Sequence, residues 1–241
     1  MREFIGTDEL KDARIREADM SGAQIRGVNF SNVTITDSWL FNTDISGMIG
    51  GLKINGVEVE PLIEAELDRR HPERTKLRPK DVDGLRAAFD VVEDMWAQTV
   101  ERARRLPEAK LHERVGVEYS FVETLRHLIF ATDSWITRLV LRVPDGHHEW
   151  GVAPDLPPDA PPDAGPELDP VLELRAERFA WIRDYLSGAT DADLPVIVSA
   201  PDSTAHPQGT FPVLDCFRVV LREEWWHNQY ATRDLAVLEQ R

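Results

Sequence analysis

The chain has 241 residues, 42% of them hydrophobic and 29% charged, so it is long enough for one large domain or two small ones. Its 28 Lys and Arg stand against 43 Asp and Glu, which leaves a formal net charge of −15 at pH 7. The excess lies in residues 81–241, where 29 acidic residues oppose 16 basic ones. Phosphate binding requires clustered cations, so we expect neither nucleic acid nor a membrane surface among the partners.

The single cysteine, Cys216, excludes an intramolecular disulfide and a cysteine-rich zinc site. The N-terminal residues contain no apolar run typical of a signal peptide. No stretch of the chain approaches the roughly 18 apolar residues of a membrane-spanning helix. We therefore expect a cytoplasmic protein.

A five-residue repeat occupies the first fifty residues. Large apolar residues recur at every fifth position: Leu10, Ile15, Met20, Ile25, Phe30, Ile35, Leu40 and Ile45. A mostly small residue stands two positions before each of them: Asp8, Ala13, Ala18, Ala23, Val28, Val33, Ser38 and Thr43. A period of five fits neither a helix nor a strand. It predicts a chain that turns a corner every five residues, with both marked positions pointing inward.

This pattern resembles the pentapeptide-repeat family, which implies a right-handed square β-solenoid with four repeats per coil. Eight repeats would form about two coils, and solenoid coils bury their core only by stacking on one another. A structural or docking module is the plainer interpretation of the segment, and a ligand-binding role is the alternative.

A hairpin and a short helix are predicted after the repeat. Asn55 and Gly56 form a turn dipeptide between β-branched residues, which is typical of a β-hairpin. Pro61 then begins a short helix that stops before Pro72. Residues 71–80 are polar, basic and bounded by prolines, which indicates a linker.

Four helices are predicted in residues 81–241. The first begins at Asp81 or Asp83 and continues to about residue 105, with apolar residues three to four positions apart. The second begins near Ser120, with Glu123 completing a capping box, and ends before the proline at 144. The remaining elements are a helix over 170–187, a short strand over 194–198 and a helix over 212–238.

The connection over residues 144–170 holds eight prolines and seven acidic residues and no Lys or Arg, so it is predicted to be a loop. It is either a lid over a site or an acidic connector.

Two of the predicted helices carry residues that can ligate a metal. Glu223 and His227 are spaced i and i+4, so they lie on one face of the last helix. A carboxylate and an imidazole next to apolar neighbours are costly unless they are satisfied, and a metal is one way to satisfy them. A surface Glu–His pair is the alternative. The second helix contributes His127, which by itself is equally compatible with a surface or core histidine.

Together these features resemble the DinB-like superfamily of metal-binding four-helix bundles, over roughly residues 81–241. Its pattern places an aromatic residue and a serine at the start of the second helix, as in Tyr119-Ser120, followed by a histidine that His127 matches. Its last helix carries two histidines four residues apart. Here His227 fits the second, and Glu223 stands in place of the first. The resemblance therefore implies a His–Glu–His site for a divalent metal, zinc or nickel.

The thiol-transferase branch of this superfamily implies an activity. Three protein ligands leave coordination positions open, and a metal there lowers the pKa of a bound thiol. The thiol would be mycothiol, bacillithiol, glutathione or another small cofactor, and its partner an electrophile, because Cys216 is expected to be buried in its helix.

Other polar residues have plainer interpretations. Glu224 is rotated about 100° from Glu223, so it is either exposed or in contact with a ligand. Tyr230 either reaches the site or packs in the core, and Asp234 pairs with Arg233 or Arg222.

His147 and His148 are expected on a loop surface. His206 either closes over the site or belongs to a polar loop. Of Trp225 and Trp226, one packs inward and the other contacts the solenoid or a second subunit of a homodimer.

The predicted fold is mainly α with a small β part. It has a short N-terminal β-solenoid over 1–58, a helix and linker over 59–80, and a DinB-like four-helix bundle over 81–241. The predicted function is that of a metal-dependent transferase that uses a small thiol. The alternative is a non-catalytic metal-binding or scaffold protein that acts through its solenoid and bundle surface.

Overall fold

The computed structural model describes residues 4, 6–116, 118–143, 146–154, 165–199 and 207–241. Contacts divide the chain into two compact units, residues 1–49 and residues 50–241. The elements are β1 (Lys53–Ile54), β2 (Val57–Glu58), α1 (Glu60–Arg70), the 3-10 helix η1 (Pro72–Leu77), α2 (Val82–Ala103), α3 (Glu108–Leu111), α4 (Phe121–Thr132), the π-helix η2 (Asp133–Thr137), α5 (Leu168–Gly188), β3 (Ile197–Ser199), β4 (Thr210–Pro212) and α6 (Val213–Leu238). The coarse prediction of a mainly helical fold with a small β part is confirmed.

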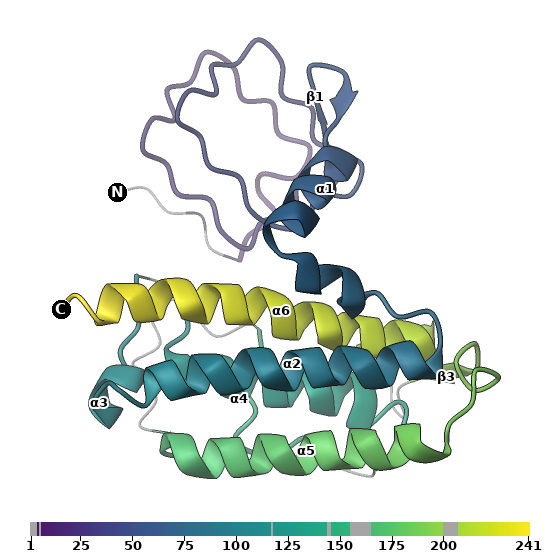
Figure 1. The fold of residues 1–241 in the computed structure, drawn as a ribbon. Helices are drawn as coiled ribbons and strands as arrows, with labels where there is room; N and C mark the ends of the chain where they lie inside the picture. Colours follow the sequence, from purple (N-terminus) through teal and green to yellow (C-terminus); the bar gives the residue numbers. More distant parts are fainter. Residues whose placement is uncertain (1–3, 5, 117, 144–145, 155–164, 200–206) are drawn as a thin grey trace. The chain divides into compact units, whose positions relative to one another are not determined.

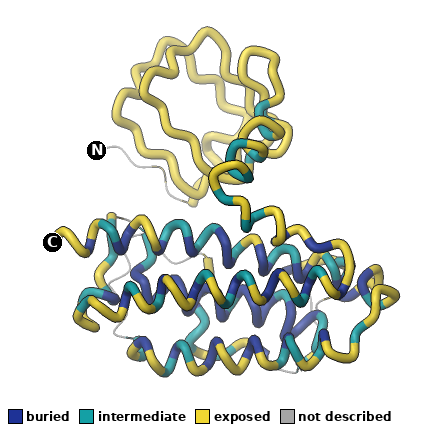
Figure 2. The backbone as a smooth tube through the Cα atoms, in the orientation of Figure 1, coloured by how far each residue is buried: buried dark blue, intermediate teal, exposed yellow. Residues whose placement is uncertain are grey.

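The first unit changes direction at every fifth residue, as the repeat predicts. The corners are residues with positive φ: Asp12, Glu17, Gly22, Gly27, Asn32, Asp37, Asn42 and Gly47. Gly, Asn and Asp tolerate this left-handed conformation best, which is why they dominate these positions. The expected burial of the large residues is wrong, because all eight remain between 48% and 62% exposed. Figure 2 shows the described part of this unit as exposed almost throughout.

In the second unit, the hairpin of β1 and β2 turns at Asn55 and Gly56, which both have positive φ. The helix predicted at Pro61 is α1, and residues within the expected linker form η1, whose Leu77 is buried. The strand predicted over 194–198 agrees only in part with β3, which begins at Ile197, ends at Ser199 and pairs antiparallel with β4.

One hydrophobic core lies between the four long helices of this unit. α6 packs on α2 and α4, and α5 packs on α4 and α2 (Figure 1). The buried faces point toward one another (Figure 2), with Phe89 of α2 in contact with Phe179 of α5 and Phe217 of α6. Each aromatic side chain adds a large buried area to the core, which fixes the relative positions of the helices that carry the site.

The second predicted helix is shorter than expected. α4 ends at Thr132, and the chain continues as the π-helix η2 over Asp133–Thr137. Asp133 is fully buried and bonds to Arg178 of α5 and to the backbone N–H of His148. These tertiary contacts widen the turn, which no local sequence preference indicates.

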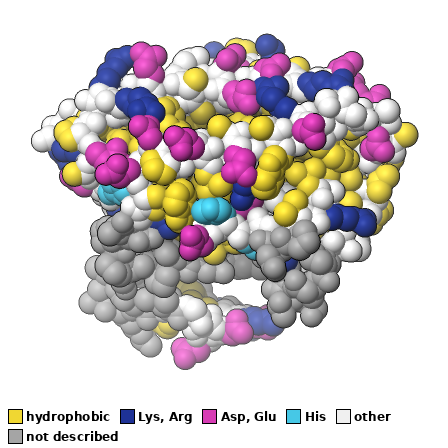
Figure 3. Space-filling model, turned by 90° about the horizontal axis from the view of Figure 1, so that it is seen from below, with side chains coloured by type: hydrophobic (Ala, Val, Ile, Leu, Met, Phe, Trp, Pro, Cys, Tyr) yellow, Lys and Arg dark blue, Asp and Glu magenta, His cyan; other side chains and the backbone are white. Residues whose placement is uncertain are grey.

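None of the helices in the described part of the chain combines the length and the apolar character that a membrane span requires. On the face that Figure 3 shows, acidic and basic side chains are dispersed among apolar ones.

Candidate metal centre

His127 is positioned by the start of α4. Ser120 is the N-cap, and its hydroxyl accepts a bond from the N–H of Glu123 at 3.2 Å. The Glu123 carboxylate accepts the N–H of Ser120 at 2.8 Å in return, so the predicted capping box is confirmed. Arg114 also donates to Glu123 at 2.8 Å. This fixed start places His127, two turns further on, on the side of α4 that faces α6.

The other two side chains lie one turn apart on α6. The i, i+4 spacing of Glu223 and His227 stacks them on the same face of that helix. Their side chains are 30% and 14% exposed, and that of His127 is 9% exposed. The group is therefore enclosed around the imidazoles and reachable from solvent beside Glu223.

The structure brings the three side chains together. One potential ligand atom of each lies within 4.8 Å of those of the other two. Nε2 of His127 is 3.9 Å from a carboxylate oxygen of Glu223, and the ring centroids of His127 and His227 are 4.8 Å apart. Among the described residues no other His, Cys, Asp and Glu side chains cluster in this way.

Both imidazoles are held through Nδ1 by a backbone carbonyl. Nδ1 of His127 is 2.9 Å from the carbonyl oxygen of Val152, and Nδ1 of His227 is 2.9 Å from the carbonyl oxygen of Glu223. A carbonyl only accepts, so each Nδ1 carries the proton that is donated. Each Nε2 then presents a lone pair, which is the form in which a histidine ligates a metal.

The environment also sets charge states that suit ligation. Burial lowers the pKa of His227, and His127 nearby lowers it further, so the imidazole stays neutral. Burial alone would raise the pKa of Glu223, but the neighbouring His127 and His227 outweigh it and hold the pKa below its ordinary value. A carboxylate and two imidazoles form a donor set that fits zinc and other divalent metals.

Aromatic rings surround the cluster. Tyr119 stacks on His127 at 5.3 Å between centroids, and Phe130 lies beyond the same ring at 6.3 Å. Tyr230 meets His227 edge-on at 5.8 Å and also stacks on Trp226 at 6.0 Å between centroids. These rings limit the access of water to the two imidazoles.

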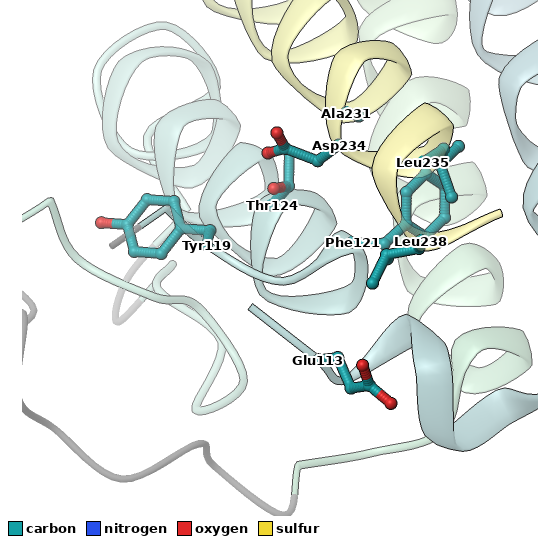
Figure 4. Close-up of a pocket in the computed structure, with 8 residues that line it drawn as sticks. All are labelled: Glu113, Tyr119, Phe121, Thr124, Ala231, Asp234, Leu235 and Leu238. Carbon is teal, nitrogen blue, oxygen red and sulfur yellow. The ribbon is translucent and has the colours of Figure 1, made fainter. Parts of the chain in front are cut away.

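A small pocket lies beside the start of α4 and the C-terminal part of α6, and none of the three clustered side chains lines it. Its lining residues are Glu113, Tyr119, Phe121, Thr124, Ala231, Asp234, Leu235 and Leu238. Figure 4 shows Asp234 and Thr124 pointing toward one another across it, with Tyr119 at one side. Asp234 is paired with Arg233 at 2.7 Å and 3.0 Å, as one of the two expected pairings predicted.

Glu224 departs from both of its expectations, because it is neither exposed nor paired with a residue of the cluster. It is not exposed but fully buried, in an ion pair with Arg175 of α5 at 2.8 Å. Arg175 in turn lies over the ring of Trp96, 5.4 Å from its centroid. The residue next to Glu223 therefore fixes α6 to α5 and points away from the cluster.

The remaining expectations have mixed outcomes. His147 is exposed as predicted, and Cys216 is buried as predicted. Trp225 packs inward under Arg74, and Trp226 is partly buried against it at 4.6 Å between centroids. His206 and residues 144–145 and 155–164 of the proline-rich connection lie outside the described residues.

Sequence reasoning missed two groups that support the cluster. The carbonyl of Val152 cannot be recognised from a sequence, because every residue carries one. The buried pair of Asp133 and Arg178, at 2.6 Å, joins residues far apart in the chain, and no motif marks it.

Comparison with known protein families agrees with this geometry. Residues 9–47 match the family model for pentapeptide repeats, in eight copies. Residues 91–231 match the family model of the DinB superfamily, and this match spans all three clustered side chains. No curated protein and no solved structure is similar enough to match. With more than half of its residues covered by that model, the chain belongs to the DinB superfamily.

Proposed function

We propose that the protein is a metal-dependent enzyme that transfers a low-molecular-weight thiol to an electrophile. A divalent metal, zinc or nickel, is held by His127, Glu223 and His227. The observation that carries this proposal is the convergence of three donor side chains within 4.8 Å, with both imidazoles fixed through Nδ1. Membership in the DinB superfamily supports the proposal, because the family match over residues 91–231 includes all three residues.

The residues around the site have defined tasks in this proposal. In His127 and His227 the contact of Nδ1 with a carbonyl leaves Nε2 as the atom for ligation. Glu223 supplies negative charge and is the most exposed of the three side chains. When bound, the metal supplies positive charge that lowers the pKa of a thiol near it. Tyr119 and Tyr230 flank the two imidazoles and reduce the access of water.

The thiol is a small cofactor such as mycothiol or bacillithiol, and the chain's own cysteine does not provide it. Cys216 is fully buried, and burial raises the pKa of its thiol to about 12. A thiol of this kind is neutral at physiological pH and inaccessible to an electrophile.

Metal content tests the proposal directly. The protein, purified without an affinity tag and dialysed against zinc or nickel, is expected to hold about one divalent ion per chain by mass spectrometry. His127→Ala and Glu223→Ala are expected to lose it. His112→Ala is the matched control, because His112 forms the same i, i+4 pair with Glu108 but has no third donor nearby among the described residues.

Absence of metal in the wild-type protein under these conditions would refute the enzyme proposal. With metal present, mycothiol, bacillithiol and glutathione are then tested in turn with a reactive halide, and loss of free thiol is measured.

A second function is favoured by the exposed apolar residues of the repeat. Positions 20 residues apart have matching exposures, 61% and 62% for Ile15 and Ile35, and 51% each for Met20 and Leu40. In coils of four repeats these are stacked partners, so each has one covered face and one open face. We propose as the alternative that this segment is a scaffold surface on which a second copy of the chain stacks.

Light scattering on the full chain tests this alternative. Wild type is expected to be a dimer, and Ile15→Lys with Ile35→Lys a monomer of unchanged helix content. Exposed positions tolerate the charge in the monomer, whereas an apolar interface does not. A monomeric wild type at all concentrations contradicts the scaffold alternative.

A further inference from the structure

Residues 146–153, called the strap below, follow η2 and run back along α4. The strap is held to that helix by backbone and side-chain bonds. Nε of Arg126 donates to the carbonyl of Trp150 at 2.8 Å, and the N–H of Val152 donates to the carbonyl of Arg126 at 3.3 Å. Tyr119 donates its hydroxyl to the carbonyl of Ala153 at 3.2 Å. The Val152 carbonyl is thereby presented to Nδ1 of His127 at 2.9 Å.

The other end of the strap is anchored on a buried ion pair. Asp133, the first residue of η2, accepts the N–H of His148 at 3.0 Å through one carboxylate oxygen. Its other oxygen accepts from Arg178 at 2.6 Å and from the hydroxyl of Thr137 at 3.0 Å. A fully buried carboxylate with this many donors is rigid, so the strap begins from a fixed point.

Two glycines occupy closely packed positions in the strap, Gly151 against α4 and Gly146 against the segment that contains and follows η2. A Cβ on Gly151 would lie 3.1 Å from the carbonyl oxygen of His148 and 3.3 Å from Cβ of Phe130. A Cβ on Gly146 would lie 2.9 Å from Cγ of Arg138 and 3.0 Å from the carbonyl oxygen of Val143. A larger residue at either position requires its neighbours to shift, and we expect this shift at Gly151 to displace the neighbouring Val152 carbonyl that His127 uses.

We propose that the strap is a positioning device for His127. It holds the proton of this imidazole on Nδ1 and so leaves Nε2 free to ligate, and Asp133 is the positioning residue that anchors it. The part of the inference that concerns metal affinity rests on the proposed function, whereas the part that concerns the tautomer does not. His227 needs no such device, because its acceptor belongs to its own helix.

The tautomer is measured in the metal-free protein labelled with ¹⁵N-histidine, from the two ring nitrogen shifts of His127. Wild type is expected to carry the proton on Nδ1. Gly151→Ala is expected to shift a large share of the proton to Nε2. Gly188→Ala is the matched control, because no atom lies within 4 Å of a Cβ at that position, and its tautomer is expected to equal that of wild type.

Asp133→Asn is the second variant. An amide has one acceptor oxygen, so it cannot serve Arg178 and the N–H of His148 together, and the same shift of the proton is expected. If this variant does not fold, the tautomer measured in Gly151→Ala tests the proposal by itself.

Cobalt affinity is the second readout, followed by the visible absorption of bound Co²⁺. Both strap variants are expected to bind it about 10–100-fold more weakly than wild type, and Gly188→Ala equally well. A wild-type His127 that carries its proton on Nε2 overturns the inference, as do strap variants that keep the wild-type tautomer.

The strap proposal and the proposed function can be refuted independently of one another. A wild type with the Nδ1 tautomer, lost in Gly151→Ala, supports the strap even if no Co²⁺ binds, and in that case only the proposed function fails. A wild type that binds Co²⁺ with the proton of the metal-free imidazole on Nε2 refutes the strap alone.

Discussion

Arg175 and Glu224 form an ion pair at 2.8 Å in the core between α5 and α6, where their side chains are 7% and 0% exposed. Burial raises the pKa of Glu224, and the charge of Arg175 opposes this effect. Glu224 follows Glu223 directly, so this pair also fixes the turn of α6 that carries a proposed ligand.

Breaking this pair is expected to destabilise the protein strongly. Glu224→Leu or Arg175→Met alone leaves an uncompensated buried charge, which costs about 3–5 kcal/mol in free energy of unfolding. The double variant removes both charges and is expected to recover most of the loss. Urea denaturation followed by circular dichroism measures all three.

Arg183→Met is the comparison for this experiment, because Arg183 pairs with Glu93 at the surface and its loss is expected to cost less than about 1 kcal/mol. A double variant as unstable as the sum of its single variants would mean that the two charges do not act as a pair.

The N-cap of α4 contributes measurable stability. Ser120→Ala removes the acceptor for the N–H of Glu123 and is expected to lower the free energy of unfolding by about 1 kcal/mol. Ser120→Asp keeps a capping oxygen and should retain most of it. Equal losses in both variants would assign the effect to burial of the side chain and not to capping.

The stabilising effect of Glu123 is expected to depend on pH. Burial raises the pKa of this carboxyl, but Arg114 and the N–H of Ser120 outweigh it, so the folded-state pKa lies below the ordinary 4.5. A depressed pKa contributes stability above the unfolded value, and this stability is lost as pH falls through the folded value. Glu123→Gln should therefore be less stable than wild type at pH 7.

The same comparison at lower pH supplies the check. The difference in free energy of unfolding between Glu123→Gln and wild type is expected to shrink as pH falls from 4.5 through the lower folded-state pKa, where the Glu123 carboxyl takes up a proton. Denaturant titrations across this range measure it, and a difference that is constant with pH would contradict the assignment.

Cys216 is expected to be unreactive in the native protein. Its thiol has a pKa of about 12 and no exposed surface, so a disulfide reagent should label it only as fast as the chain unfolds. Labelling rates with and without urea test this expectation. Rapid labelling under native conditions would return Cys216 to consideration as a nucleophile.

Local signals in the sequence predicted much of the fold. The capping box at Ser120, the turn dipeptide at Asn55 and the five-residue period each have a physical cause within a few residues, and each appears in the structure. The widened turn of η2 was not predictable, because its cause is the contact of Asp133 with Arg178 in another helix.

The candidate site was likewise predictable only where its features depend on local sequence. Spacing places Glu223 and His227 on one face, but only a family resemblance links them to His127, since they belong to different helices. The contacts of Val152 and Glu224 follow from packing. Adjacent residues on a helix point about 100° apart, and the sequence does not tell which of two neighbouring glutamates faces a core arginine.

The three clustered side chains come from two helices, so the cluster is complete only when both helices have been synthesised. His127 comes from α4, whereas Glu223 and His227 come from α6, which is synthesised after α5 and the β3–β4 hairpin. A nascent chain that has completed α4 carries His127 without the other two members of the cluster. If the cluster binds a metal as proposed, the complete donor set becomes available only after α6 has been synthesised and packed against α4.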